Sequence, residues 1–323
     1  MATMTYAKAV GLALGEAMEE DDRVFCLGED VGYGGAYGAT QGLRERFGPD
    51  RVRDTPISEI AIVGFSVGAA VTGLRPVPEI MHFDFITVAM DQVVNQAAKM
   101  RYMFGGKATL PLVIRCGTGG WLNAAAQHSQ SLEAWFTHVP GLKVAAAGTP
   151  ADIRNLLRAA IRDENPVIVQ EALSLYEESG EVPDEAEEWE LGTAMTKRPG
   201  TDVTLVTWGA MVPRVLDASE MLAADGIEAE VIDLISLFPW DRDAVLESVA
   251  RTNRLVVVHQ AVRRSGFGAE VVAEMAERAF DHLDAPILRV AALNTPVPFS
   301  PPLEEYVLPT ADRVVDAVKS IAA

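Results

Sequence analysis

Short apolar segments alternate with longer amphipathic segments along most of the chain. The short segments predict buried strands, at Val24–Leu27, Val77–Met81, Leu112–Cys116, Val144–Ala147, Val167–Gln170, Val203–Thr207, Ala229–Leu234, Leu255–Val258 and Ile287–Val290. The longer segments predict helices, at Ser58–Leu74, Ala151–Arg162, Val212–Ala224, Arg242–Ala250, Ala269–Phe280 and Ala311–Ala322. Strands and helices in alternation are typical of parallel sheets with helices on both faces.

The alternation is interrupted once, by an acidic segment. Residues 177–190 are dominated by acidic side chains and include Gly180 and Pro183, a composition typical of solvated linkers. We therefore expect an α/β protein with two doubly wound domains and mainly parallel sheets, at residues 1–185 and 201–323, joined by an acidic linker region at residues 186–200.

Composition narrows the classes of partner and location. The formal net charge of −19 repels phosphate backbones, so no nucleic-acid partner is expected. The acidic surface is suited to water or to a basic protein. The apolar run Ile60–Leu74 is too short to span a bilayer comfortably, and the N-terminal residues lack the features of a signal peptide. The two cysteines, Cys26 and Cys116, are too few for an iron–sulfur cluster. As free thiols in apolar stretches they fit a cytoplasmic protein.

Common nucleotide and metal motifs are missing from the sequence. The glycine-rich segment GYGGAYG (32–38) does not follow a strand and open a helix, so it does not predict a dinucleotide site. There is no Walker A sequence, no H-E-x-x-H and no cysteine–histidine cluster. An α/β fold alone leaves the function open.

Two local motifs carry a more specific signal. They are TPISE (55–59) and AAQHSQS (125–131), and family-like segments such as LGEDVGYGGAYGAT (27–40) and SGFGAE (265–270) accompany them in order. From about residue 4 to its C-terminus, the chain resembles the β subunits of the thiamine-diphosphate-dependent pyruvate, branched-chain 2-oxo acid and acetoin dehydrogenases, the E1 components.

The resemblance implies half of an enzyme. In that family the first domain of β binds the pyrimidine half of thiamine diphosphate, while an α subunit holds the diphosphate and Mg²⁺ through a G-D-G motif, which this chain lacks. The second domain resembles the transketolase C-terminal domain. The implied partners are an E1 α subunit in an α₂β₂ heterotetramer and a lipoyl acyltransferase, E2. The implied reaction decarboxylates a pyruvate-like 2-oxo acid, or cleaves acetoin, and passes the acyl group to lipoyl.

Two residues match the family's catalytic groups. Glu59 matches the glutamate whose carboxyl group bonds the aminopyrimidine ring and so activates the cofactor. A first-turn glutamate could instead serve only the helix dipole, but the TPISE context favours catalysis. His128 matches a histidine that exchanges protons with the reacting group and assists acyl transfer. The other four histidines are interpreted as structural, and His82 is the least certain because it is close to Phe85.

Further matches concern the pocket and a cation. Phe85 and Met81 match residues that contact the aminopyrimidine, although both could be plain core residues. Glu29 matches an acid in a chain that links two active sites, or it is an ordinary loop acid. A structural potassium site is implied at Asp163, Asn165, Leu112, Ala160 and Ile161, where a helix C-terminus followed by a turn is the alternative.

The sequence also departs from the family in its second domain. Ile235 stands where an arginine is usual, Gln260 where glutamate is common and Ser265 where glycine is common, and Arg263 and Arg264 are unusual there. Because these departures lie in the second domain, we expect the chemistry of the family to be intact and the assembly partner to differ from that of the family. Two alternatives stay open: a carboligase subunit that forms acyloins in a specialised pathway, and a scaffold subunit without activity.

Overall fold

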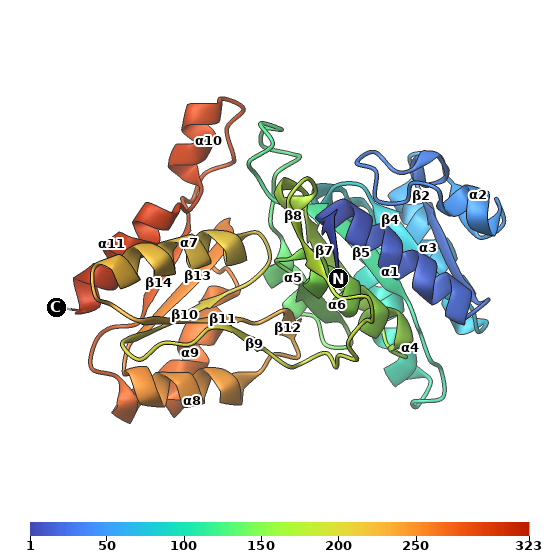
Figure 1. Cartoon of the computed structure of the whole chain (residues 1–323). Helices are drawn as coiled ribbons and strands as arrows, with labels where there is room; N and C mark the ends of the chain where they lie inside the picture. Colours follow the sequence, from blue (N-terminus) through green and yellow to red (C-terminus); the bar gives the residue numbers. More distant parts are fainter. Residues whose placement is uncertain (323) are drawn as a thin grey trace.

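The computed structural model describes residues 1–322, which form two α/β domains side by side (Figure 1). The first domain is built on a seven-stranded sheet in the order β12-β6-β7-β5-β4-β2-β3. The second is built on a five-stranded sheet in the order β14-β13-β10-β11-β9. The predicted fold class, two doubly wound domains with mainly parallel sheets, is therefore confirmed.

Six strands of the first sheet are parallel to one another. They are β2 (Val24–Gly28), β3 (Val52–Asp54), β4 (Arg75–Ile80), β5 (Val113–Thr118), β6 (Lys143–Ala146) and β7 (Val167–Ala172). The seventh, β12 (Ser236–Phe238), comes from the second half of the chain and pairs antiparallel with β6. A strand from the second half thus completes the first sheet, which the local pattern did not predict.

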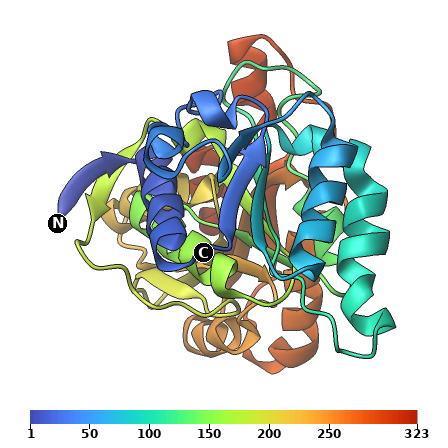
Figure 2. The same ribbon diagram turned by 90° about the vertical axis from the view of Figure 1, so that its right-hand side faces the viewer.

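Helices cover both faces of the first sheet. On one face lie α1 (Tyr6–Glu20) and α6 (Pro150–Arg162), which pack against each other. On the other lie α3 (Glu59–Val71), the 3₁₀ segment η2 (Phe83–Ala89) and the π-helical segment η3 (Asp91–Ala97), which leads into α4 (Ala98–Met103). Figure 2 shows these two layers on either side of the strands. The short helices α2 (Leu43–Phe47) and α5 (Glu133–Thr137) and the 3₁₀ turns η1 (Val31–Tyr33) and η4 (Leu173–Leu175) complete the domain.

The second sheet has the same layered plan. Its strands are β9 (Met195–Arg198), β10 (Val203–Thr207), β11 (Ala229–Asp233), β13 (Leu255–Val262) and β14 (Leu288–Ala292), and only β9 is antiparallel to its neighbour. One face is covered by α7 (Met211–Ala224) and α11 (Ala311–Ala322), and the other by α8 (Arg242–Thr252) and α9 (Gly268–Arg278). The 3₁₀ turn η5 (Phe280–His282) follows α9, and α10 (Pro301–Val307) stands at the edge of the domain (Figure 1).

The expected linker differs in part from the structure. Residues 179–182, predicted as solvated linker, form β8 (Ser179–Val182), which pairs antiparallel with β1 (Ala2–Thr5). Residues 195–198, also assigned to the linker, form β9 of the second sheet. Edge strands need only backbone hydrogen bonds, so acidic side chains that remain in water do not prevent pairing. Residues 183–194 have no regular structure.

Two further expectations can be compared with the described residues. Ser58, the first residue of the helix predicted at Ser58–Leu74, precedes the first residue of α3, and its side chain makes no capping hydrogen bond. Cys26 and Cys116 are free and buried, and burial raises the pKa of Cys26 to about 12. Such thiols are chemically inert near neutral pH. None of the helices formed by residues 1–322 combines the length and the apolar character needed to cross a bilayer.

Candidate active site

The predicted site residues gather at one edge of the first sheet. Six parallel strands end there, and the segments that follow four of them carry Glu29 after β2, Glu59 after β3, Met81 and Phe85 after β4, and His128 after β5. In open parallel sheets, ligands bind in the crevice outside the carboxyl ends of the strands. The topology therefore places these residues where such a sheet binds its ligand.

Three aromatic rings meet at the centre of this edge. The ring centroid of Phe85 lies 5.1 Å from that of His128, and the ring of His82 lies 4.8 Å from His128, both edge to face. Nε2 of His82 forms a hydrogen bond of 3.0 Å with the hydroxyl group of Tyr37, which lies in the glycine-rich segment after β2. Phe85 and His128 are half-buried, so both rings border open space. The structure thus adds His82 and Tyr37 to the predicted pair.

The two acids of the site lie close enough for the charge of Glu59 to act on Glu29. Glu59 is buried in the first turn of α3, where the helix dipole favours its negative charge. Burial raises the pKa of Glu29, and the charges of Glu59, Asp30 and Glu79 raise it further. Because α3 packs against η2, Glu59 begins a helix that lies against the segment carrying Phe85.

A buried ion network lies beneath the site. The guanidinium group of Arg115, which is 1% exposed, donates to both carboxylate oxygens of Glu171 at 2.6 and 2.8 Å and to Glu79 at 2.7 Å. Burial alone would lower the pKa of Arg115, but the two carboxylates outweigh it and hold that pKa well above its usual value. Tyr176 donates its hydroxyl hydrogen to Glu171, and its ring lies edge to face with Tyr37, with 5.9 Å between centroids. The network therefore supports the floor of the site.

The residues of the expected potassium site lie elsewhere, at the amino ends of β5 and β7. The carbonyl oxygens of Leu112 and Ala160 accept backbone N–H groups at 2.9 and 3.2 Å. The Ile161 carbonyl oxygen accepts from the guanidinium group of Arg75 at 2.9 Å. The carboxylate of Asp163 accepts from Lys143 and from the Asn165 side chain, and Asn165 accepts from Arg101. Basic side chains thus already contact the oxygens of Ile161, Asp163 and Asn165, whereas those of Leu112 and Ala160 accept only backbone N–H groups.

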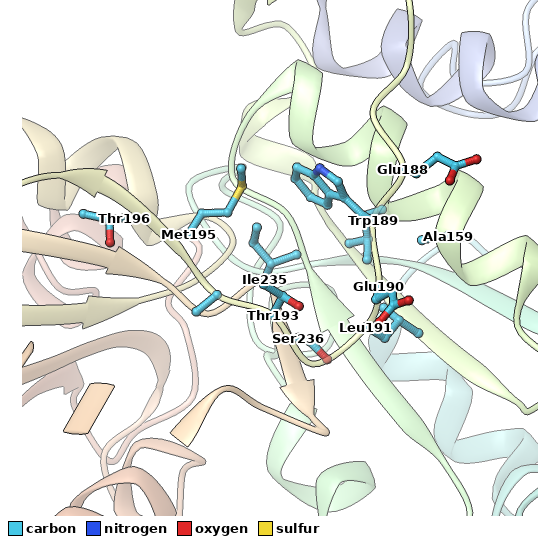
Figure 3. A pocket seen from close by; sticks show the side chains of 12 residues that line it. Ala159, Glu188, Trp189, Glu190, Leu191, Thr193, Met195, Thr196, Ile235 and Ser236 are labelled. Carbon is cyan, nitrogen blue, oxygen red and sulfur yellow. The ribbon is translucent and has the colours of Figure 1, made fainter. Parts of the chain in front are cut away.

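A separate cavity of about 490 Å³ lies at the junction of the two domains (Figure 3). Trp189, Met195 and Ile235 point into it from the connecting segment, β9 and the segment before β12. Ile235, which replaces the usual arginine, has a left-handed φ of 53°. None of the lining residues belongs to the edge that carries His128, and the cavity offers no acid–base pair. The chemistry therefore points to the strand edge and away from this cavity.

Some residues of the site lay beyond sequence reasoning. No sequence motif marks Tyr37, the Arg115 network or Asp84, which is in η2 next to Phe85. The order of the strands alone brings these residues to the site. His82 was the one signal available, because it follows a strand directly and lies close to Phe85. Among the described residues, no group of three or more histidine, cysteine, aspartate or glutamate side chains is arranged to hold a metal ion.

Comparisons with known proteins cover nearly the whole chain. Residues 2–178 match the family described as transketolase, pyrimidine binding domain, and residues 192–314 match transketolase, C-terminal domain. The chain is 48% identical to the β subunit of acetoin:2,6-dichlorophenolindophenol oxidoreductase from Cupriavidus necator, over 96% of this chain and 95% of that one. It is 46% identical to the pyruvate dehydrogenase E1 component subunit beta of Rhizobium meliloti, over 99% of this chain and 70% of the relative.

Two further similarities extend this result. The chain is 42% identical to the 2-oxoisovalerate dehydrogenase subunit beta of Bacillus subtilis, over 100% of this chain and 99% of the relative. A solved split gene transketolase, an inactive β4 tetramer, superposes with a TM-score of 0.83 at 24% identity and covers 99% of this chain and 98% of that one. At that identity the likeness concerns the fold.

Proposed function

The chain belongs to the transketolase-like family of E1 β subunits of 2-oxo acid and acetoin dehydrogenases, and from this premise we propose how it works. We propose that it supplies one half of a thiamine-diphosphate site, that an α subunit supplies the other half, and that the complete enzyme decarboxylates a small 2-oxo acid or cleaves acetoin. The acyl group then passes to lipoyl. The observation that carries this proposal is the meeting of Phe85 and His128 at the strand edge that Glu59 also borders.

The residues at this edge fit the pyrimidine half of thiamine diphosphate. An aminopyrimidine ring needs a carboxyl group for its ring nitrogen and an apolar surface for its face. Glu59 offers the carboxyl group at a helix N-terminus, and Phe85, with Met81 beside it, offers a half-buried apolar surface. When bound, thiamine diphosphate supplies a nucleophilic carbon and an electron sink for breaking the bond next to a carbonyl group.

The side chains of this chain then have separate tasks. Glu59 holds a proton for the aminopyrimidine ring, which a buried carboxyl group can share without exchange with bulk water. His128 takes up and releases protons at the reacting group, and its ring packs edge to face against the rings of both Phe85 and His82. The rise that the charge of Glu59 causes in the pKa of Glu29 supports a further proposal, that Glu29 belongs to a chain of acids linking two active sites.

An exposed apolar stripe supports a partner subunit. Along the start and outer face of α3, exposed residues recur on one side: Ile57, Ile60, Phe65, Gly68 and Val71. The exposed fraction is 82% for Ile57 and 55% for Phe65, which is unusual for apolar side chains beside a catalytic acid. Contiguous exposed apolar surface marks interaction sites. We propose that such a surface is covered in an α₂β₂ heterotetramer, in which α holds Mg²⁺, and that the enzyme docks to a lipoyl acyltransferase.

A structural potassium site is a further proposal. A carbonyl oxygen has two lone pairs, so one hydrogen bond leaves a second pair for a cation. We propose that Leu112, Ala160, Ile161, Asp163 and Asn165 share their oxygens between K⁺ and the backbone or basic side-chain donors beside them. A thermal unfolding midpoint higher in KCl than in NaCl of equal concentration is expected, and equal midpoints would contradict the site.

Met81 and Phe85 resemble the pattern of enzymes for pyruvate and acetoin more than that of branched-chain enzymes. We therefore propose a preference for pyruvate or acetoin over 2-oxoisovalerate. The ratio of kcat/KM values in the reconstituted enzyme measures it, and a clear preference for 2-oxoisovalerate would refute it.

The experiment for the whole proposal is reconstitution. The chain alone is titrated with thiamine diphosphate and Mg²⁺ in a calorimeter, and the titration is repeated after mixing with an E1 α subunit from the same organism. Tight binding and turnover are expected only in the mixture. Stoichiometric binding of thiamine diphosphate with turnover by the chain alone would contradict the proposal that the chain supplies only half of the site. If the mixture did not bind thiamine diphosphate, a scaffold subunit without activity would be favoured.

A further inference from the structure

The loop that carries His128 has an unusual backbone. Between the end of β5 and His128, three residues with side chains have left-handed φ angles: Trp121 at 65°, Asn123 at 54° and Ala125 at 64°. Residues with a Cβ atom rarely adopt this conformation, and alanine has no side-chain hydrogen bond to compensate for it. Such a backbone persists only where surrounding groups hold it.

The second domain provides a group that holds it. Oε1 of Glu304 accepts the backbone N–H of Trp121 at 2.8 Å, and Oε2 accepts that of Asn123 at 3.1 Å. Glu304 lies in α10 and is only 2% exposed, whereas its neighbours Leu303 and Glu305 are exposed. Hydrogen bonds from N–H groups to a buried carboxylate are stronger than those between neutral groups. One carboxylate thus holds two of the three left-handed positions.

Other residues of the second domain contact the start of this loop, at residues 119–121. The guanidinium group of Arg214, in α7, lies 3.5 Å from the ring centroid of Trp121. A Cβ atom on Gly119 would lie 2.1 Å from Oε1 of Gln260 in β13, and one on Gly120 would lie 2.6 Å from Cδ1 of Leu308. Two elements of the second domain besides α10 therefore contact the start of this loop.

The end of the loop is held by the first domain. Oδ1 of Asp84 accepts both the backbone N–H of Gln130 at 3.3 Å and its side-chain N–H at 2.7 Å. The Gln130 carbonyl oxygen accepts from the hydroxyl group of Thr118 at 3.2 Å, so the two ends of the loop are joined. His128 thus lies between an anchor from each domain, Glu304 before it and Asp84 after it.

We propose that Glu304 is a positioning residue, through which the second domain sets the place of His128 beside Phe85. Within residues 1–322, the carboxylate of Glu304 forms no ion pair with a basic side chain, and the two backbone N–H groups are its hydrogen-bond donors. Its structural role is therefore directed at the loop. The consequence for catalysis rests on the role proposed above for His128, whereas the consequence for the loop does not.

The test compares Glu304→Gln with Glu305→Gln, a matched change at the exposed neighbour. In Glu304→Gln, one acceptor oxygen becomes an NH₂ group that cannot accept the second N–H. Amide hydrogen exchange of the full chain should become at least about tenfold faster in peptides covering residues 121–128 and stay unchanged in the sheet of the second domain. Glu304→Asp, which keeps a shorter carboxylate, should give an intermediate increase and guards against misfolding of the first variant.

The outcomes are distinguishable. Unchanged exchange at residues 121–128, or an equal increase throughout the second domain, would overturn the positioning role. In the enzyme reconstituted with α, kcat should fall by about tenfold or more in Glu304→Gln. Hydrogen exchange at the thiazolium carbon, the step assigned to Glu59, should remain near the rate of the unchanged protein. Faster loop exchange with an unchanged kcat would support Glu304 as the anchor and count against the proposed role of His128.

Discussion

The hydroxyl group of Tyr37 lies 3.0 Å from Nε2 of His82, and the His82 ring in turn lies edge to face with His128 at 4.8 Å between centroids. Burial lowers the pKa of His82, and the charge of His128 lowers it further. Nε2 of His82 makes the bond with Tyr37, while its Nδ1 is buried and has no hydrogen-bond partner within residues 1–322. Tyr37 and His82 thus form a hydrogen-bonded pair whose imidazole ring packs against His128.

The Tyr37–His82 bond should be measurable as a coupling energy. Tyr37→Phe and His82→Phe each remove one partner while keeping a ring in place. The double variant should lose less stability than the sum of the two, with a coupling of about 0.5–1.5 kcal/mol, the usual net value of a hydrogen bond. Urea unfolding of the four proteins measures it. Tyr33→Phe, at an exposed tyrosine, should show no coupling to His82→Phe, and additive losses for Tyr37 and His82 would argue against the bond.

Glu59 and His128 should affect different steps of the reaction. Glu59→Gln keeps the shape of the side chain but removes the exchangeable carboxyl proton, so hydrogen–deuterium exchange at the thiazolium carbon should slow by about 10²–10⁴-fold. His128→Ala should leave that exchange nearly unchanged and reduce turnover instead. The measurement uses the complex reconstituted with α. If both variants slowed the exchange equally, or Glu59→Gln had no effect on it, the two roles would be wrongly assigned.

The Arg115 network should dominate the stability of the first domain. Arg115→Met leaves Glu79 and Glu171 buried without their cation, so unfolding in guanidinium chloride should show a loss of about 3–5 kcal/mol at pH 7. The loss should shrink as the pH falls to 5, because the unpaired carboxylates then take up protons. Arg23→Met, at an exposed ion pair with Asp21, should cause a far smaller loss, because water screens exposed ion pairs. A similar small loss in Arg115→Met would contradict the structural importance of the network.

His259 should make the protein less stable in mild acid. Burial, with a contribution from the charge of Arg289, lowers the pKa of His259 from 6.5 to about 4. The folded state therefore binds this proton less readily than the unfolded state, and stability is lost as the pH falls from about 6.5 towards 4. The total over this window is about 3 kcal/mol, at roughly 1.4 kcal/mol for each pKa unit.

The variant His259→Gln cannot titrate and should flatten this decline. Urea unfolding at pH 7.5, 6 and 5 gives the slope, and His282→Gln, at an exposed histidine, should leave the slope of the unchanged protein intact. Absolute stability is not the criterion, because His259 also stacks on Trp208 with 5.4 Å between centroids. The same slope in His259→Gln and in the unchanged protein would exclude His259 as its source.

Local patterns in the sequence predicted most of the elements. Strand residues such as Val203–Thr207 and helix residues such as Ala311–Ala322 coincide with β10 and α11. Burial on both faces of a strand leaves a continuous apolar run, and burial on one face of a helix leaves a helical period. The segment 179–182 was wrongly predicted as linker, because an edge strand pairs through backbone groups that leave little trace in side-chain composition. The entry of β12 into the first sheet depends on a contact between distant parts of the chain, which no local window contains.

The sequence by itself determined the fold class, the family and the motifs that hold Glu59 and His128, since each depends on residues that are neighbours along the chain. Only the tertiary structure decided that Tyr37 and His82 lie near His128. It also decided that Glu304, in the second domain, binds the loop that precedes His128. The physical reason is that a hydrogen bond between distant segments requires a strand order and a domain contact that bring its atoms together. A polar residue shows its type in the sequence, but its partner is set by the topology.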